Sequence, residues 1–237
     1  MPIQLTVVLQ MLEIIFNDNY LVAINKPPGL AVHRSPLIGN TDEFALQLLR
    51  DQIGQKVFPC HRLDRKTSGV LIFALNKDLL PKMMTLFAEG KLCKKYLAIV
   101  RGYTSDEGVI DYALKDGSGK SKEAVTIYRT LERIELNVPF GKHQTSRYSL
   151  VEATPQTGRM HQLRKHFAHI LHPLIGDRPH GCNKQNKLFL EKWDMKEMLL
   201  HARSLEFVHP KTHETLQLKA EFHGEFQRIT EMMGFIL

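Results

Sequence analysis

Short runs of apolar residues, separated by turn-forming residues, recur along most of the chain and are typical of β-strands. The runs 12–16 and 20–24 flank Asn17-Asp18-Asn19, which predicts a β-hairpin. Lys26-Pro27 then ends the second run, because proline has no backbone N–H to donate to a neighbouring strand. The same pattern predicts further strands at 70–74, 95–101, 124–130, 133–138, 147–153, 199–208 and 215–220.

Apolar residues with helical spacing predict helices at 44–50, 79–89, 160–169 and 222–233. Thr41-Asp42-Glu43 is the expected cap of the first helix, and Gly90 the expected end of the second. A polar stretch at 116–123 predicts a loop. Strands outnumber helices, so we expect an α+β fold on a mixed, mostly antiparallel sheet with flanking helices. We expect one catalytic domain over 12–237, after a short extension at 1–11.

The charge balance favours an anionic partner. The 237 residues include 32 lysines and arginines against 25 aspartates and glutamates, a formal net charge of +7. Such an excess is typical of nucleic-acid-binding proteins. The three cysteines form no C-x-x-C pair, which argues against a disulfide framework and a zinc ribbon. The N-terminus lacks the pattern of a signal peptide, and no apolar run approaches the roughly 18 residues of a membrane span. We therefore expect a cytoplasmic protein without membrane association.

One segment, 61–69, combines a carboxylate with several cations just before the apolar run 70–74. Asp64 lies there between Arg62 and Arg65, on a turn that a buried strand would hold in place. An ionised carboxylate surrounded by cations can act as a nucleophile or base while the cations hold phosphates. The alternative is an ordinary turn whose aspartate caps local amides, and the residues alone leave both interpretations open.

The sequence His61-Arg-Leu-Asp-Arg-x-Thr-Ser-Gly69 resembles the signature of the RluA family of pseudouridine synthases. Blocks at 26–29, 94–102, 157–166 and 200–202 are similar to the other blocks of that family and occur in the same order. The resemblance implies that Asp64 is the essential catalytic residue. It further implies that Tyr96 is the active-site tyrosine, Arg164 the basic partner of Asp64, and Leu200 an apolar residue of the pocket.

The implied reaction breaks the N1–C1′ bond of a uridine, turns the uracil and rejoins it through C5. No redox step or group transfer is involved, so we expect neither a cofactor nor a metal. Arg62 is the candidate to fill the space that the flipped uridine leaves, since flipping costs a few kcal/mol. The remaining candidates for contacts with RNA phosphates are Arg65, Arg159, Lys94, Lys95 and Lys165.

The choice of RNA rests on weaker similarities. The segments 51–58, 147–152 and 169–181 are most similar to the compact branch of the family that modifies uridine 65 of transfer RNA. Many relatives carry an N-terminal S4 RNA-binding domain, which we do not expect here. The expected partner is therefore transfer RNA, bound by a monomer. Ribosomal RNA is the alternative substrate, and a non-catalytic RNA-binding protein is a further alternative.

Two other motifs suggest different chemistry. His161, His166, His169, His172, His180 and Cys182 lie close together in the sequence, as metal ligands often do. They match no H-E-x-x-H or zinc-finger spacing, so we expect no metal site. Gly119-Lys120-Ser121 is similar to the end of a phosphate-binding P-loop, but Leu114 stands where that motif needs glycine.

Overall fold

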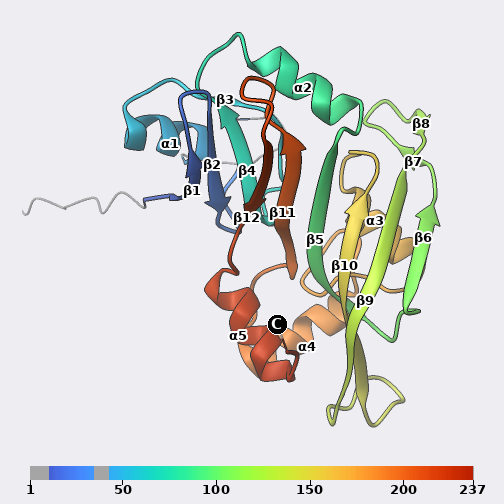
Figure 1. The fold of residues 1–237 in the computed structure, drawn as a ribbon. Helices are drawn as coiled ribbons and strands as arrows, with labels where there is room; N and C mark the ends of the chain where they lie inside the picture. The colour runs from blue at the N-terminus through green and yellow to red at the C-terminus, as the bar shows by residue number, and fades with distance from the viewer. Residues whose placement is uncertain (1–10, 35–42, 237) are drawn as a thin grey trace, which may run out of the picture.

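The computed structural model describes residues 11–34 and 43–236. One large mixed sheet runs through the molecule, with its strands in the order β1-β2-β4-β11-β5-β10-β9-β6 (Figure 1). The short β3 (Phe58–Pro59) pairs with β4, and β12 (Thr215–Lys219) pairs with β11. The other strands are β1 (Glu13–Asn17), β2 (Leu21–Lys26), β4 (Ser68–Ala74), β5 (Leu92–Arg101), β6 (Glu107–Asp111), β9 (Val125–Leu136), β10 (Ser146–Pro155) and β11 (Leu200–Val208).

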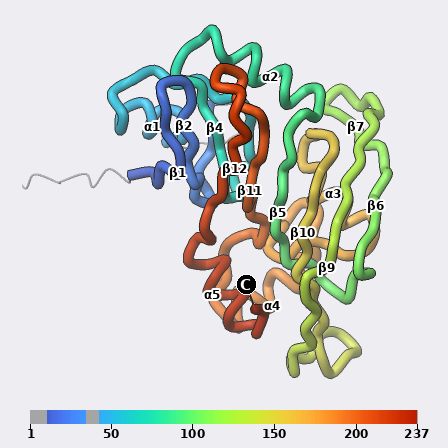
Figure 2. The backbone as a smooth tube through the Cα atoms, in the orientation of Figure 1, coloured from blue at the N-terminus to red at the C-terminus, as the bar shows by residue number. Residues whose placement is uncertain are grey.

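The centre of the sheet joins segments that are far apart in the sequence. β11 pairs parallel with β4, at His201–Ser68 and Ala202–Gly69, and antiparallel with β5 on its other side. Figure 2 shows β11 next to β5, although β6, β9 and β10 lie between these two strands in the sequence. Every residue of β2 and β4 is buried, as expected for strands covered on both faces. The α+β fold with a mixed, mostly antiparallel sheet is confirmed.

Helices cover both faces of the sheet (Figure 1). α1 (Ala45–Ile53) and α3 (Gln162–His169) pack on what we call the first face, through Leu49 and Phe167. α2 (Leu80–Ala88), α4 (Asn183–Trp193) and α5 (Gly224–Met233) pack on the second face. Among the described residues, no helix combines the length and the hydrophobicity needed to cross a membrane.

Most predicted elements are present, and two of their ends have clear causes. Asp18 closes the β1–β2 hairpin, because its Oδ1 accepts hydrogen bonds from the backbone N–H groups of Tyr20 and Leu21 at 2.7 and 2.6 Å. The predicted cap of α1 is not the N-cap of this helix. Phe44 occupies that position and makes no side-chain capping bond, while Thr41 and Asp42 lie outside the described residues.

Three segments differ from the sequence-based expectation. The two strands predicted at 124–130 and 133–138 are one strand, β9, whose pairing with β10 is shifted at Leu131. A β-bulge there breaks the apolar alternation without ending the strand. The predicted loop at 116–123 contains most of a small hairpin, formed by β7 (Leu114–Lys115) and β8 (Ser121–Lys122). The helix α4 was not predicted, since few of its residues are apolar.

Candidate active site

Asp64 lies on the turn that leads into β4. The turn is closed by a hydrogen bond from the backbone N–H of Thr67 to the carbonyl oxygen of Asp64, at 3.0 Å. Behind it, Gly69 (φ 107°) lets β4 approach β11 closely, since a Cβ there would come within 2.2 Å of the carbonyl oxygen of Ala202. The carboxylate is 27% exposed and faces α3. A buried strand therefore holds a charged group at the surface of the first face.

Arg164, in the first turn of α3, connects this carboxylate to a second one. Its Nη1 donates to Oδ2 of Asp64 at 2.9 Å. Its Nε and Nη2 donate to the two oxygens of Asp177, at 2.9 and 2.7 Å. The side chain is only 6% exposed, and two anions offset the cost of burying its charge. The predicted pairing of Arg164 with Asp64 is thus present, together with a partner that the sequence did not suggest.

The start of α3 is held by Gln162, a buried side chain in the predicted block 157–166. Its Oε1 accepts hydrogen bonds from the backbone N–H of Arg159 at 3.0 Å and the hydroxyl of Thr157 at 2.7 Å. Its Nε2 donates to the carbonyl oxygen of Val125 on β9, at 2.9 Å. These bonds fix the helix to the sheet, and Arg164 is thereby directed towards Asp64.

His161 approaches Asp64 from the same helix end. It is the N-cap of α3 and has a left-handed backbone conformation (φ 57°, ψ 28°), which is uncommon for a residue other than glycine. Its Nε2 lies 3.9 Å from Oδ2 of Asp64, and its Nδ1 is hydrogen-bonded to Nε2 of His180 at 2.9 Å. Desolvation lowers the pKa of both imidazoles, so the pair is neutral near pH 7.

Tyr96 and Leu200 form the apolar side of the site. The first face has two apolar clusters, one around Leu49 of α1 and one around Phe167 of α3. Tyr96 on β5 packs against both clusters, and Leu200 on β11 belongs to the cluster around Phe167. Burial, and secondarily the charge of Asp64, raises the pKa of Tyr96, which therefore keeps its proton at neutral pH. An aromatic ring and a protonated phenol thus lie near the carboxylate of Asp64.

Lys26, at the end of β2, is hydrogen-bonded to the backbone of the Asp64 turn. Its Nζ donates to the carbonyl oxygens of Pro27 at 2.7 Å, Leu30 at 2.8 Å and Arg65 at 3.2 Å. Burial lowers the pKa of Lys26 to about 7, while the charge of Asp64 opposes this shift. Three carbonyl acceptors match the three N–H bonds of the ammonium form. Its block was recognised in the sequence, but this contact joins residues too far apart for spacing to reveal.

Several cations surround the carboxylate. Arg62 and Arg65 are exposed, and Nε of Arg65 donates to the carbonyl oxygen of Gly29 at 2.8 Å. The pKa of Lys66 is lowered by desolvation and then by the positive charge of Arg178, with smaller contributions from Arg164 and Arg65. Lys66 and Arg178 therefore belong to the same positive patch, although neither was a sequence candidate. Lys66 occupies the unmatched position of the signature, and Arg178 lies far along the chain.

The other cations that the sequence suggested as RNA contacts lie at different places relative to Asp64. Lys165 lies close enough to the His161–His180 pair to lower the pKa of both rings. Arg159 donates to the carbonyl oxygen of Glu123 at 2.9 Å, and Lys94 to that of Thr157 at 3.3 Å. Lys95 lies on the second face, because neighbouring strand residues point to opposite sides of a sheet.

On that second face, Lys95 pairs with Glu152 at 3.3 Å, and both side chains are partly exposed. The structure therefore does not bring Lys95 to the Asp64 cluster. The candidate roles of Lys94 and of Lys95 in contacting RNA phosphates stay predictions.

The clustered histidines make separate contacts. His166 is hydrogen-bonded to the hydroxyl of Thr126 and the carbonyl oxygen of Tyr112, both at 3.0 Å. His169 stacks on Tyr112, with ring centroids 3.6 Å apart, and His172 contacts the carbonyl oxygen of Arg101. Across residues 11–34 and 43–236, no group of three or more His, Cys, Asp or Glu side chains is placed to hold a metal ion.

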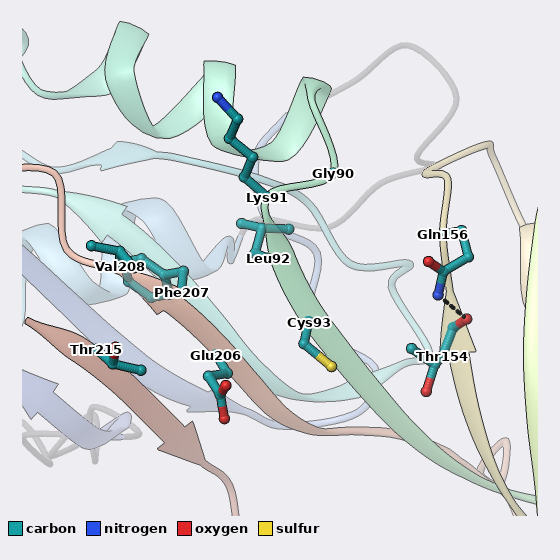
Figure 3. A pocket seen from close by; sticks show the side chains of 10 residues that line it. All are labelled: Gly90, Lys91, Leu92, Cys93, Thr154, Gln156, Glu206, Phe207, Val208 and Thr215. Atoms are coloured by element: carbon teal, nitrogen blue, oxygen red, sulfur yellow. Dashed lines mark hydrogen bonds between the residues drawn. The ribbon is translucent and has the colours of Figure 1, made fainter.

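A surface pocket of about 430 Å³ lies away from the Asp64 cluster (Figure 3). It is lined by residues of β5, β10, β11 and β12, including Cys93, Thr154 and Glu206. It shares no lining residue with the cluster around Asp64 and Arg164, so it takes no part in that arrangement.

Comparison with known proteins places these residues in a family. The family model described as "RNA pseudouridylate synthase" matches residues 20–169, which include Asp64, Tyr96 and Arg164. The chain belongs to the RNA pseudouridylate synthase family. It is 50% identical to the "tRNA pseudouridine synthase C" of Vibrio parahaemolyticus over 229 residues, which cover 92% of this chain and 93% of that protein. It is 46% identical to the Vibrio cholerae protein of the same name, over 95% of this chain and 97% of the other.

Solved structures support the same fold. The structure titled "Human RNA Pseudouridylate Synthase Domain Containing 4" superposes with a TM-score of 0.74 and 26% identity, covering 95% of this chain and 94% of the human one. "Human RNA Pseudouridylate Synthase Domain Containing 1" gives a TM-score of 0.71 and 25% identity, over 90% and 84% of the two chains. The expected membership of the RluA-type pseudouridine synthases is confirmed.

Proposed function

We propose that this RNA pseudouridine synthase acts on transfer RNA, and that its target is uridine 65. The observation that carries the chemical part is the partly exposed Asp64 carboxylate, held by the buried guanidinium of Arg164 at 2.9 Å beside the ring of Tyr96. The substrate class is supported by relatives at 42–50% identity over nearly the whole chain, all named tRNA pseudouridine synthase C.

In this proposal Asp64 performs the covalent or basic step on the uridine. Arg164 orients the carboxylate through a charge-assisted hydrogen bond. Tyr96 stacks on the uracil, and its hydroxyl takes up the proton that leaves C5 while it passes its own proton to solvent, so that the phenol stays neutral. Leu200 contributes to the apolar floor against which the base packs.

The RNA is bound by the cations around the site. Arg65, Lys66, Arg178 and Lys165 contact phosphates, and Arg62 fills the space vacated by the flipped uridine. Arg62 and Arg65 are exposed on the same turn as Asp64, so their charges are accessible to the phosphates of an RNA whose uridine reaches Asp64. If at least four of these cations contact phosphate, affinity falls steeply with salt. A cytoplasmic location, a monomeric state, the domain limits at residue 12 and the independence from metal and cofactor stay predictions.

The decisive experiment maps pseudouridine in unmodified transfer RNA and ribosomal RNA after incubation with the protein and with Asp64→Ala. We expect conversion of one transfer-RNA uridine, at position 65, by the wild-type protein only. Conversion restricted to ribosomal RNA would retain the chemistry and overturn the substrate. Tight RNA binding without conversion would instead favour a non-catalytic RNA-binding protein.

A further inference from the structure

We propose that Asp177 and His180 are positioning residues for the reaction, acting through Arg164 and His161 respectively. Both lie in the segment 174–181, between α3 and α4, which we call the supporting loop. The proposal rests on the proposed function, because it concerns the same carboxylate, Asp64. Arg164 of α3 and His161, the N-cap of this helix, both face Asp64, and each of them is hydrogen-bonded to one residue of the supporting loop.

Asp177 determines how Arg164 meets Asp64. The two oxygens of Asp177 accept from Nε and Nη2, the side of the guanidinium that forms bidentate pairs with carboxylates. An N–H of Nη1 donates to Oδ2 of Asp64, and these three bonds use three of the five N–H groups of the guanidinium. Asp177 therefore fixes the plane and the direction in which Arg164 presents Nη1 to the reactive carboxylate.

Removal of the charge on Asp177 changes this geometry. An asparagine offers only one acceptor oxygen, and its amide N–H groups oppose those of the guanidinium. The guanidinium is then held by fewer bonds and no longer has one fixed orientation towards Asp64. We infer that Asp177 acts by maintaining this orientation.

The supporting loop is built to keep Asp177 in place. Asp177 is 1% exposed. The side-chain amide of Asn186 on α4 donates to the carbonyl oxygen of Asp177 at 2.7 Å and accepts from the N–H of Gly176 at 2.9 Å. At Gly176 (φ 82°) a Cβ would lie 2.1 Å from the carbonyl oxygen of Glu197, so the loop packs directly on the backbone beyond it. The carboxylate thus has a fixed position before any substrate binds.

His180 determines the protonation pattern of His161. The carboxylate of Asp64, 3.9 Å from Nε2 of His161, favours the tautomer with its proton on that nitrogen. Nδ1 of His161 is then an acceptor, and Nε2–H of His180 donates to it at 2.9 Å. At 3.9 Å the Nε2–H of His161 makes no full hydrogen bond to Asp64, so it is free to donate to a substrate oxygen in the same space. Arg164, Lys165 and Asp177 are the other charged groups that face this pair.

The test compares single-turnover rates and RNA dissociation constants for five variants of the full chain. Asp177→Asn and His180→Leu remove the two positioning contacts, whereas His180→Gln keeps an N–H donor. Asp106→Asn and His169→Gln are the matched controls, because Asp106 pairs with Arg133 at the surface and His169 stacks on Tyr112. Thermal unfolding confirms that each variant is folded.

We expect Asp177→Asn to lower the rate about 10- to 100-fold, in the range found when partners of catalytic groups are removed. We expect a loss of roughly fivefold for His180→Leu and less than about twofold for His180→Gln. RNA affinity stays within about threefold for all of these variants, because neither residue carries RNA binding in this proposal. Wild-type rates in folded Asp177→Asn, or equal rates for His180→Leu and His180→Gln, would overturn the proposal.

Nitrogen-15 NMR of the imidazoles supplies a readout independent of catalysis and of whether Asp177→Asn folds. The expected wild-type spectrum has the His161 proton on Nε2 and the His180 proton on Nε2. A His161 proton on Nδ1 would overturn the role of His180. A wild-type protein that converts no uridine would contradict the proposed function instead, and the imidazole spectra would still decide the geometry of the His161–His180 pair.

Discussion

The two faces of the central sheet differ in where their charged side chains lie. On the first face, under α1 and α3, buried or half-buried ions meet in one cluster formed by Lys26, Asp64, Arg164 and Asp177. On the second face, under α2, α4 and α5, the core is formed by apolar side chains such as Met83 and Phe189. Ion pairs there, such as Lys95–Glu152, remain at the surface.

This difference shows where the fold accepts an energetic cost. Burying an ion pair costs several kcal/mol per ion in desolvation. The attraction between the two charges offsets this cost only when their geometry is good. An apolar core of the same volume would stabilise the sheet at least as well. In the proposed function the first face carries these charges for chemistry, and Asp64 and Asp177 are each paired with Arg164.

The largest effect is expected from Asp64→Asn. This substitution removes the reactive carboxylate, and single-turnover conversion of uridine should fall by about 10⁴-fold or more. Arg164 keeps both hydrogen bonds to Asp177, so the free energy of unfolding in urea should change by less than about 1 kcal/mol. Glu152→Gln on the second face is the control and should convert RNA like the wild type. Residual activity above about 1% would contradict the role of Asp64.

The next effect concerns the buried ion pair itself. Arg164→Met leaves Asp177 buried without its cation, and the free energy of unfolding should fall by about 3–5 kcal/mol. The double variant Arg164→Met/Asp177→Leu should recover much of this loss, because it removes both charges, but should remain inactive. Urea unfolding measures the stability and single-turnover kinetics the activity. A double variant less stable than Arg164→Met would show that the pair contributes more than its charges.

The second face also buries titratable rings, and one of them, His201, gives a pH dependence. Burial lowers the pKa of His201 to about 4, and its ring nitrogens contact the hydroxyl of Ser68 at 2.9 Å and the carbonyl oxygen of Ala220 at 3.1 Å. In the unfolded chain His201 becomes protonated as the pH falls below 6.5, whereas in the folded protein it stays neutral until about pH 4. Stability from this group is therefore complete above pH 6.5 and is lost as the pH falls, by about 1.4 kcal/mol per unit.

Urea unfolding between pH 4 and 7 tests this expectation. His201→Asn has no such titration, so its stability should depend less on pH over that range than that of the wild type. Parallel curves for the two proteins would assign the acid sensitivity to other groups.

The smallest effects separate Lys94 from Lys95. Lys94→Ala should weaken RNA binding a few-fold, whereas Lys95→Ala should change it by less than about twofold, because Lys95 lies on the second face. The stability of Lys95→Ala should change by less than about 0.5 kcal/mol, as is usual for exposed ion pairs. Dissociation constants at one fixed salt concentration measure the difference. Equal losses for both variants would place RNA on both faces of the sheet.

Residues close together in the sequence were the ones whose arrangement could be predicted. The buried strand 70–74 and the turn before it follow from apolar runs and turn residues, both of which act over a few positions. The family signature identified Asp64, and the other blocks identified Tyr96, Arg164 and Leu200. The bulge at Leu131 and the weakly apolar α4 were missed because a local pattern does not reveal what packs against it.

The sequence by itself determined the α+β composition of the fold, the Asp64 turn, and the family to which both belong. Only the tertiary structure decided which groups act on that carboxylate. Asp177 is more than one hundred residues from Asp64, and the two meet through Arg164 because β4, β11 and α3 assemble into one face. Position relative to distant residues follows from packing, and packing is a property of the whole fold.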